Sequence, residues 1–104
     1  MASSKQYLEF ILNQLSSLDD ISCRQMMGEY ILYYQGKVFG GIYDDRFLVK
    51  NIKAARQLMP HAHLELPYEG AKPMLLVDNV DNRAFLSELL NAMVNELPMP
   101  RKKH

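Results

Sequence analysis

The sequence predicts a two-layer α+β domain with an antiparallel sheet and helices packed on one face. Tyr30 to Tyr34 and Val38 to Tyr43 are two runs rich in β-forming residues, separated by Gln35-Gly36. Asp44-Asp45 then turns the chain into a third run, Phe47 to Val49. Runs of this kind joined by two-residue turns are typical of a β-meander. With helical patterns on both sides of the meander, the expected order is α-β-β-β-β-α-β-α.

An amphipathic helix is expected to open the domain, because apolar residues recur there at helical spacing. These residues are Tyr7, Leu8, Ile11, Leu12, Leu15 and Leu18. Ser3 or Ser4 can cap the start of this helix, and Asp19-Asp20 is expected to end it. A strand from Ile21 to Met26 follows, in which we expect Cys23 to be a small buried thiol.

After the meander we expect a short helix from Ile52 to Met59, because the proline that follows cannot continue it. A turn from Tyr68 to Pro73 then feeds a short strand from Met74 to Val77. The last helix is expected over residues 82–97 with Asp81 as its N-cap. Its apolar stripe is broad, so this helix should be the most buried.

The two tight turns of the meander predict its register. If both loops are two residues long, Tyr33 faces Val38, Leu32 faces Phe39, Ile42 faces Phe47 and Gly41 faces Leu48. One face is then wholly apolar and should pack against the helices: Ile31, Tyr33, Val38, Gly40, Ile42, Phe47 and Val49. The other face mixes tyrosines with cations: Tyr30, Leu32, Tyr34, Lys37, Phe39, Gly41, Tyr43, Arg46, Leu48 and Lys50.

The mixed face is open to two interpretations. It is either a set of cross-strand pairs on a solvated sheet or a surface for a partner, since tyrosine and arginine are favoured at interface cores. The candidate partner-binding residues are Tyr30, Tyr34, Lys37, Tyr43, Arg46 and Lys50. On this register Phe47 and Ile42 belong to the core, whereas Tyr34 and Arg46 are at least partly accessible.

Length and charge indicate one domain with a short tail. The 104 residues fit a domain over 1–97 and a disordered basic tail over 98–104. Net charge is zero, but without Arg101 to Lys103 the body has nine basic against twelve acidic residues. An acidic body is a poor phosphate-binding surface, so we expect no tight intrinsic binding to DNA.

A single cysteine excludes an internal disulfide, and the N-terminus lacks the apolar segment of a signal peptide. No apolar run approaches the roughly 20 residues that span a bilayer. We therefore expect a soluble cytoplasmic protein with no membrane partner.

No pattern in the chain indicates a catalytic residue, a cofactor or a metal. His61 and His63 lack a third ligand at a recognisable spacing, so they are interpreted as solvated loop residues. Asp44-Asp45 and the stretch from Asp78 to Asp81 are explained by turn and helix-capping chemistry. Met26-Met27 near Cys23 is interpreted as core rather than as a soft-metal site.

Several spaced residues are similar to those of a known family. They are Met26-Met27-Gly28-Glu29-Tyr30, Leu32-Tyr33, Gly36-Lys37, Asp44-Asp45-Arg46, Lys50 and Gly70-Ala71-Lys72-Pro73. Together they resemble the TfoX/Sxy N-terminal domain family over nearly the whole chain. The resemblance implies a regulatory role, because named members regulate natural competence and are thought to work with the cyclic-AMP receptor protein at promoters. Met27 and Glu29 stand where many members have Phe and Gly, and the second domain of the competence regulators has no counterpart in these residues.

Two classes of function follow from the sequence. The first is a non-enzymatic regulatory or protein-interaction module that uses the mixed face for a protein partner or for self-association, including a homodimer. The second is a small-molecule-binding protein or an enzyme, supported by Gly40-Gly41, which could let a ligand approach the sheet closely. A deep pocket with convergent polar groups would favour the second class, and a flat tyrosine-rich surface would favour the first.

Overall fold

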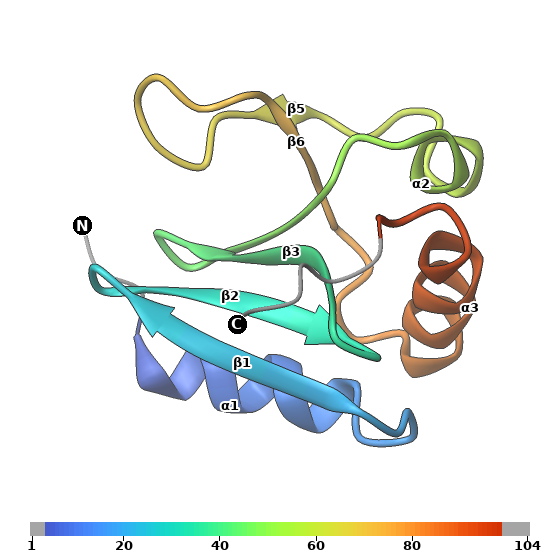
Figure 1. Cartoon of the computed structure of the whole chain (residues 1–104), viewed down its shortest axis with the longest axis horizontal. Helices are drawn as coiled ribbons and strands as arrows, with labels where there is room; N and C mark the ends of the chain where they lie inside the picture. The colour runs from blue at the N-terminus through green and yellow to red at the C-terminus, as the bar shows by residue number, and fades with distance from the viewer. Residues whose placement is uncertain (1–3, 99–104) are drawn as a thin grey trace, which may run out of the picture.

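In the computed structural model, residues 4–98 form a six-stranded antiparallel sheet with three helices (Figure 1). The elements in chain order are α1 (Lys5–Gln14), β1 (Ile21–Met26), β2 (Glu29–Tyr34), β3 (Lys37–Tyr43), β4 (Arg46–Val49), α2 (Lys53–Leu58), β5 (Leu64–Glu65), β6 (Met74–Leu76) and α3 (Arg83–Val94). This confirms the α+β class and the expected order, to which the two-residue β5 is added. In space the strands follow the order β1-β2-β3-β4-β6-β5.

Three two-residue turns join β1 to β4 as consecutive hairpins. Both residues have positive φ in Met27-Gly28 (54° and 85°), Gln35-Gly36 (54° and 77°) and Asp44-Asp45 (54° and 57°). Positive φ at both central positions is the mark of a type I′ turn, whose twist matches that of the flanking strands. The turns expected at Gln35-Gly36 and Asp44-Asp45 are confirmed.

A β-bulge in β3 interrupts the register that these turns begin. Tyr33 pairs with Val38 as expected, but Leu32 pairs with Gly40 instead of Phe39. Phe39 is therefore an extra residue in β3, and the strand changes phase there. Beyond the bulge, Ile42 pairs with Phe47 and Gly41 with Leu48, as expected.

The bulge makes the expected division into two faces wrong. In β2, the residues that join the core are Leu32 and Tyr34, which are buried, and Tyr30, which is partly buried. They lie on the same face as Ile42 and Phe47, because a shift of one residue moves every side chain of a strand to the other face. Tyr34, expected to be accessible, has only 5% of its surface exposed. The face opposite this packed face, here called the outer face, includes Tyr33, Val38, Tyr43, Arg46 and Leu48.

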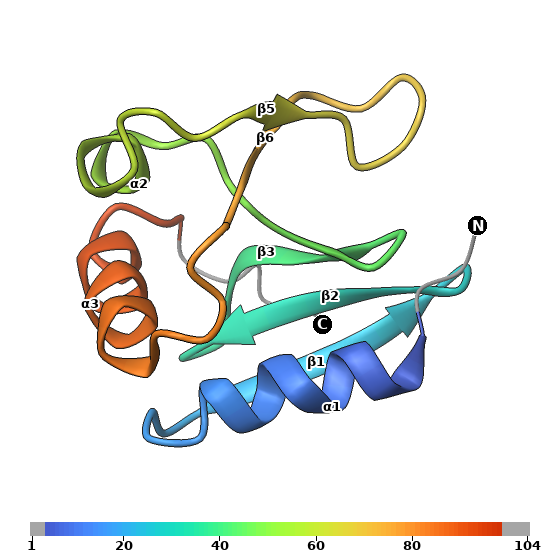
Figure 2. The same cartoon turned by 180° about the vertical axis from the view of Figure 1, so that it is seen from behind.

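The core lies between the packed face and the helices. Figure 2 shows α1 alongside β1 and β2, with α3 farther along the sheet and next to α2. One cluster of buried residues joins these elements, and its fully buried members include Ile11, Phe39, Ile42, Phe47, Leu86 and Leu89. The rings of Phe39 and Phe47 meet edge to face at 6.3 Å. The bulged residue is thus part of the centre of the core.

The helix ends differ from the expectations in detail. Ser4 caps α1, its hydroxyl oxygen accepting from the Tyr7 backbone N–H at 3.1 Å. Asn82 rather than Asp81 caps α3, accepting from the Phe85 N–H at 3.0 Å. Local pattern does not choose between adjacent residues that are both good caps. Each of the three helices is also shorter than its expected range.

Cys23 is exposed, which corrects the expectation of a buried thiol. The strand itself was predicted with the observed bounds. It is an edge strand, however, and its residues 22–26 are all exposed. Of the tail expected over 98–104, all but Pro98 lies outside the described residues.

We predict that Phe47→Ala lowers the free energy of unfolding by about 3–5 kcal/mol, because it leaves a cavity at the centre of the core. Leu64→Ala is the matched control, since Leu64 lies on a strand of the same sheet with 57% of its surface exposed. Its cost should be near the surface norm of about 0.5 kcal/mol. Urea denaturation measures both, and equal losses would contradict this assignment of the core.

Candidate functional site

A groove on the outer face brings together residues from three parts of the chain. It encloses about 540 Å³ between β3, the segment that follows β4, and the loop between β5 and β6. We call it the Tyr43 groove, and the lining residues on which its chemistry depends are Tyr43, Lys50, Asn51, Tyr68, Lys72 and Met74.

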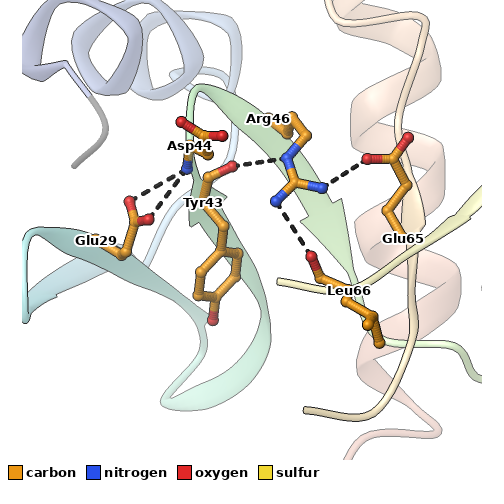
Figure 3. A network of polar contacts seen from close by, with 6 residues as sticks. All are labelled: Glu29, Tyr43, Asp44, Arg46, Glu65 and Leu66. Carbon is orange, nitrogen blue, oxygen red and sulfur yellow. Dashed lines mark hydrogen bonds and ion pairs between the residues drawn. The ribbon is translucent and has the colours of Figure 1, made fainter. Parts of the chain in front are cut away.

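Arg46 fastens one wall of the groove to the sheet (Figure 3). Its Nη1 forms an ion pair with Glu65 Oε1 at 2.6 Å, and its Nη2 donates to the Leu66 carbonyl oxygen at 3.1 Å. Its Nε donates to the Tyr43 carbonyl oxygen at 3.1 Å. The planar guanidinium can serve three acceptors at once because its donors are arranged as a rigid fork. The clamp thereby ties the start of the β5–β6 loop to the β3–β4 hairpin.

Glu29 holds the other side of the same hairpin. Both of its carboxylate oxygens lie 3.2 Å from the Asp44 backbone N–H (Figure 3). A carboxylate is a strong acceptor for a backbone N–H. The backbone around Tyr43 is therefore held by two polar contacts, one from Glu29 on β2 to the Asp44 N–H and one from Arg46 on β4 to the Tyr43 carbonyl oxygen.

The Tyr43 ring forms part of the groove and lies over Gly41, where a Cβ would collide with it. Its centroid is 6.3 Å from that of Tyr68, and the rings are tilted by 56°. Burial is the largest cause that raises the pKa of the Tyr43 phenol above its usual value of about 10. The nearby Tyr68, Glu29 and Tyr33 raise this pKa further. At neutral pH the hydroxyl is thus protonated and can donate a hydrogen bond.

Two lysines line the groove. Lys50 is half-buried and Lys72 is exposed. Within residues 4–98, neither ammonium group donates to or pairs with another residue. The groove therefore presents two cations that the described part of the fold does not use.

The six candidate partner-binding residues, expected on one face of the sheet, lie on two different faces in the structure. Tyr30, Tyr34 and Lys37 lie on the packed face, where the Tyr34 hydroxyl donates to Asn91 Oδ1 at 2.9 Å. The Lys37 ammonium donates to the Val94 carbonyl oxygen at the end of α3, also at 2.9 Å. Tyr43, Arg46 and Lys50 lie on the outer face. The expected single surface is wrong because of the bulge at Phe39, and the partner-binding role of these residues stays a prediction.

Comparison with known proteins identifies the family of this chain. The family model of the TfoX N-terminal domain matches residues 13–86. The chain belongs to the TfoX N-terminal domain family. It is also similar to an uncharacterized 12.7 kDa protein in the trpE 5′ region of Spirochaeta aurantia, with 32% identity over 104 residues, 99% of this chain and 90% of that protein. No solved structure matches the chain.

Several groove residues of this TfoX domain were not found from the sequence. The sequence places Tyr68 and Lys72 in a turn, and no local pattern indicates that this turn folds back beside β3. The ion pair of Arg46 with Glu65 spans 19 positions, which no local pattern reveals. The sequence indicates Gly40-Gly41 as a place where a ligand could approach the sheet closely. The space that their Cβ atoms would take is filled by the backbone of neighbouring strands and by Tyr43, so close packing within the protein explains both glycines.

The other candidates of the sequence do not gather into a site. His61 and His63 are exposed. Within residues 4–98, no group of three or more His, Cys, Asp or Glu side chains is placed to hold a metal ion. Over the same range, no helix is long and apolar enough to cross a bilayer.

We predict that Arg46→Ala loosens the wall of the groove, because it removes three contacts to β3, β5 and Leu66. The ion pair is about a third exposed, so we expect a loss of stability of only about 1 kcal/mol. Hydrogen exchange should rise mainly in residues 66–73. Lys53→Ala, which removes an exposed cation elsewhere, is the control and should leave exchange in that loop unchanged. Equal exchange in the loop of both variants would contradict the clamp.

Proposed function

We propose that this TfoX domain is a non-enzymatic regulatory or protein-interaction module that meets its partner through the outer face around the Tyr43 groove. Membership of the family supports a regulatory domain. We choose this surface because two tyrosines and two lysines line one groove. Tyr34 and Lys37, in contrast, form hydrogen bonds within the fold. Tyrosine is favoured at interface cores because it combines large apolar area with a polar tip.

We further propose that the domain acts in transcriptional regulation through a protein rather than by gripping DNA itself. The support is the resemblance to the N-terminal domain of competence regulators and the excess of acidic residues before the basic tail. A competence role for this chain is the finer part of the proposal and rests on that resemblance.

A small-molecule-binding protein or an enzyme is the second candidate. One observation favours it, since the volume of the Tyr43 groove falls within the range of about 300–1,000 Å³ that is usual for ligand sites. The groove also contains hydroxyl and ammonium groups that can orient a polar ligand.

We predict that Lys50→Glu combined with Tyr68→Ser weakens association without unfolding the domain. Neither side chain makes a hydrogen bond within the described residues. Sedimentation velocity measures self-association, and a pull-down quantified by mass spectrometry measures partners. Lys5→Glu combined with Phe10→Ser, two exposed residues of α1, is the matched control. If the wild type is a strict monomer and both variants retrieve the same proteins, the outer face is only a solvated sheet.

We also predict that any affinity for duplex DNA resides in Arg101 to Lys103. Such binding should fall steeply with salt, because each phosphate contact contributes about −0.9 to the slope of log K against log salt. Deleting residues 101–104 should abolish it, as measured by fluorescence anisotropy with a short labelled duplex. Sub-micromolar, sequence-selective binding that survives the deletion would show that the body itself recognises DNA.

A further inference from the structure

We propose that the Tyr43 groove binds an acidic, extended segment of a protein partner, with its carboxylates at Lys50 and Lys72 and an apolar or proline residue against the two tyrosines. This inference rests on the proposed function and identifies the class of partner.

Charge is the first argument. The residues that line the groove include two lysines and no aspartate or glutamate. This local excess of positive charge stands out because the body of the chain has more acidic than basic residues. Arg46, near the groove, is already paired with Glu65 and adds little free charge. Lys50 and Lys72 are therefore the cations that remain for an incoming anion, and opposite charge favours both encounter and register.

The apolar lining is the second argument. Pro67, Pro73 and Met74 line the groove together with the tilted rings of Tyr43 and Tyr68. Grooves lined by aromatic rings suit extended segments that contain proline, because such segments are already ordered before they bind. The two phenol hydroxyls make no hydrogen bond within residues 4–98, so they can donate to backbone carbonyls of the segment.

One side of the groove is open to solvent, which favours a segment of a protein over a small molecule as the ligand. Tyr68 has 63% of its surface exposed, and Asn51 and Lys72 are exposed as well. Sites for small molecules cover about 70–90% of the ligand surface. A small ligand in this groove would keep a large part of its surface in water, whereas the body of a protein partner covers the open side.

The experiment uses a fluorescein-labelled peptide of Glu-Pro-Leu repeats as the probe and fluorescence anisotropy as the readout. Peptides of Lys-Pro-Leu repeats and the small anion 4-hydroxyphenylacetate are the comparison ligands. Lys50→Gln with Lys72→Gln tests the groove. Lys5→Gln with Lys53→Gln is the matched control, because it removes the same charge from exposed lysines outside the groove.

We expect the acidic peptide to bind the wild type and the basic peptide not to bind. Each groove lysine should account for about a fivefold change in affinity, the factor that corresponds to about 1 kcal/mol. Tyr68→Ala should weaken binding again without any change of charge, and the control variant should bind like the wild type.

Three outcomes would overturn the inference. The first is no binding of the acidic peptide. The second is an equal loss in the groove and control variants, which would indicate charge without a site. The third is binding of 4-hydroxyphenylacetate, sensitive to the groove lysines, in the absence of peptide binding, which would identify a small-molecule site. If the peptide fails while Lys50→Glu with Tyr68→Ser still loses its partner, the proposed function stands and only the acidic segment is wrong.

Discussion

The extra residue in β3 is the constraint on which the rest of the structure depends. Without the bulge at Phe39, Leu32 and Tyr34 would face away from Ile42 and Phe47, and Ile31 and Tyr33 would lie on the core side in their place. With it, both ends of the β2–β3 hairpin contribute to one core. The residue after the bulge is a glycine, Gly40, because the β4 backbone lies so near that a Cβ there would collide with the Leu48 carbonyl oxygen. The same phase change separates Tyr43 and Arg46, on the outer face, from Tyr30 and Tyr34, which face the core.

Polar side chains from distant parts of the sequence form hydrogen bonds with the ends of the helices that cover this core. The Asp45 carboxylate accepts from the Ser4 backbone N–H at the start of α1, at 2.7 Å. Glu96 accepts from the first two backbone N–H groups of α2, which has no side-chain cap of its own. Lys37 donates to a carbonyl in the last turn of α3. Helix ends leave backbone groups unsatisfied and attract the opposite charge, so these contacts join the helices to the hairpins.

The parts of the fold that depend on neighbouring residues could be predicted from the sequence. Gln35-Gly36 and Asp44-Asp45 carry their turn chemistry locally, as does the cap at Ser4. The bulge could not be placed in the same way, because Phe39 lies among apolar residues and suits either face. Gly40-Gly41 was the available signal, since glycine inside a strand often marks a bulge, but it also fits the close approach of a ligand. The assignment of Tyr30, Tyr34 and Lys37 to the packed face depended on this choice.

Burial of Tyr34 illustrates why the candidate surface could be predicted only in part. A tyrosine and a lysine on a strand are the residue types of an interface, yet Tyr34 and Lys37 find Asn91 and Val94 on α3, 57 positions away in each case. These partners come close only when the chain has folded. Composition alone therefore does not distinguish a side chain whose polar group is hydrogen-bonded within the protein from one that is available to a partner.

The outer face differs from the packed face in what happens to its cations. Arg46 is compensated by Glu65, whereas Lys50 and Lys72 line one groove without an anion among the described residues. Lys50 is half-buried and Lys72 is exposed, and the residues that line the groove include no aspartate or glutamate. A carboxylate that enters the groove can form a charge-assisted hydrogen bond with either ammonium group. The arrangement therefore favours a bound state with an acidic group, while the Arg46 clamp keeps the wall beside it in place before the partner arrives.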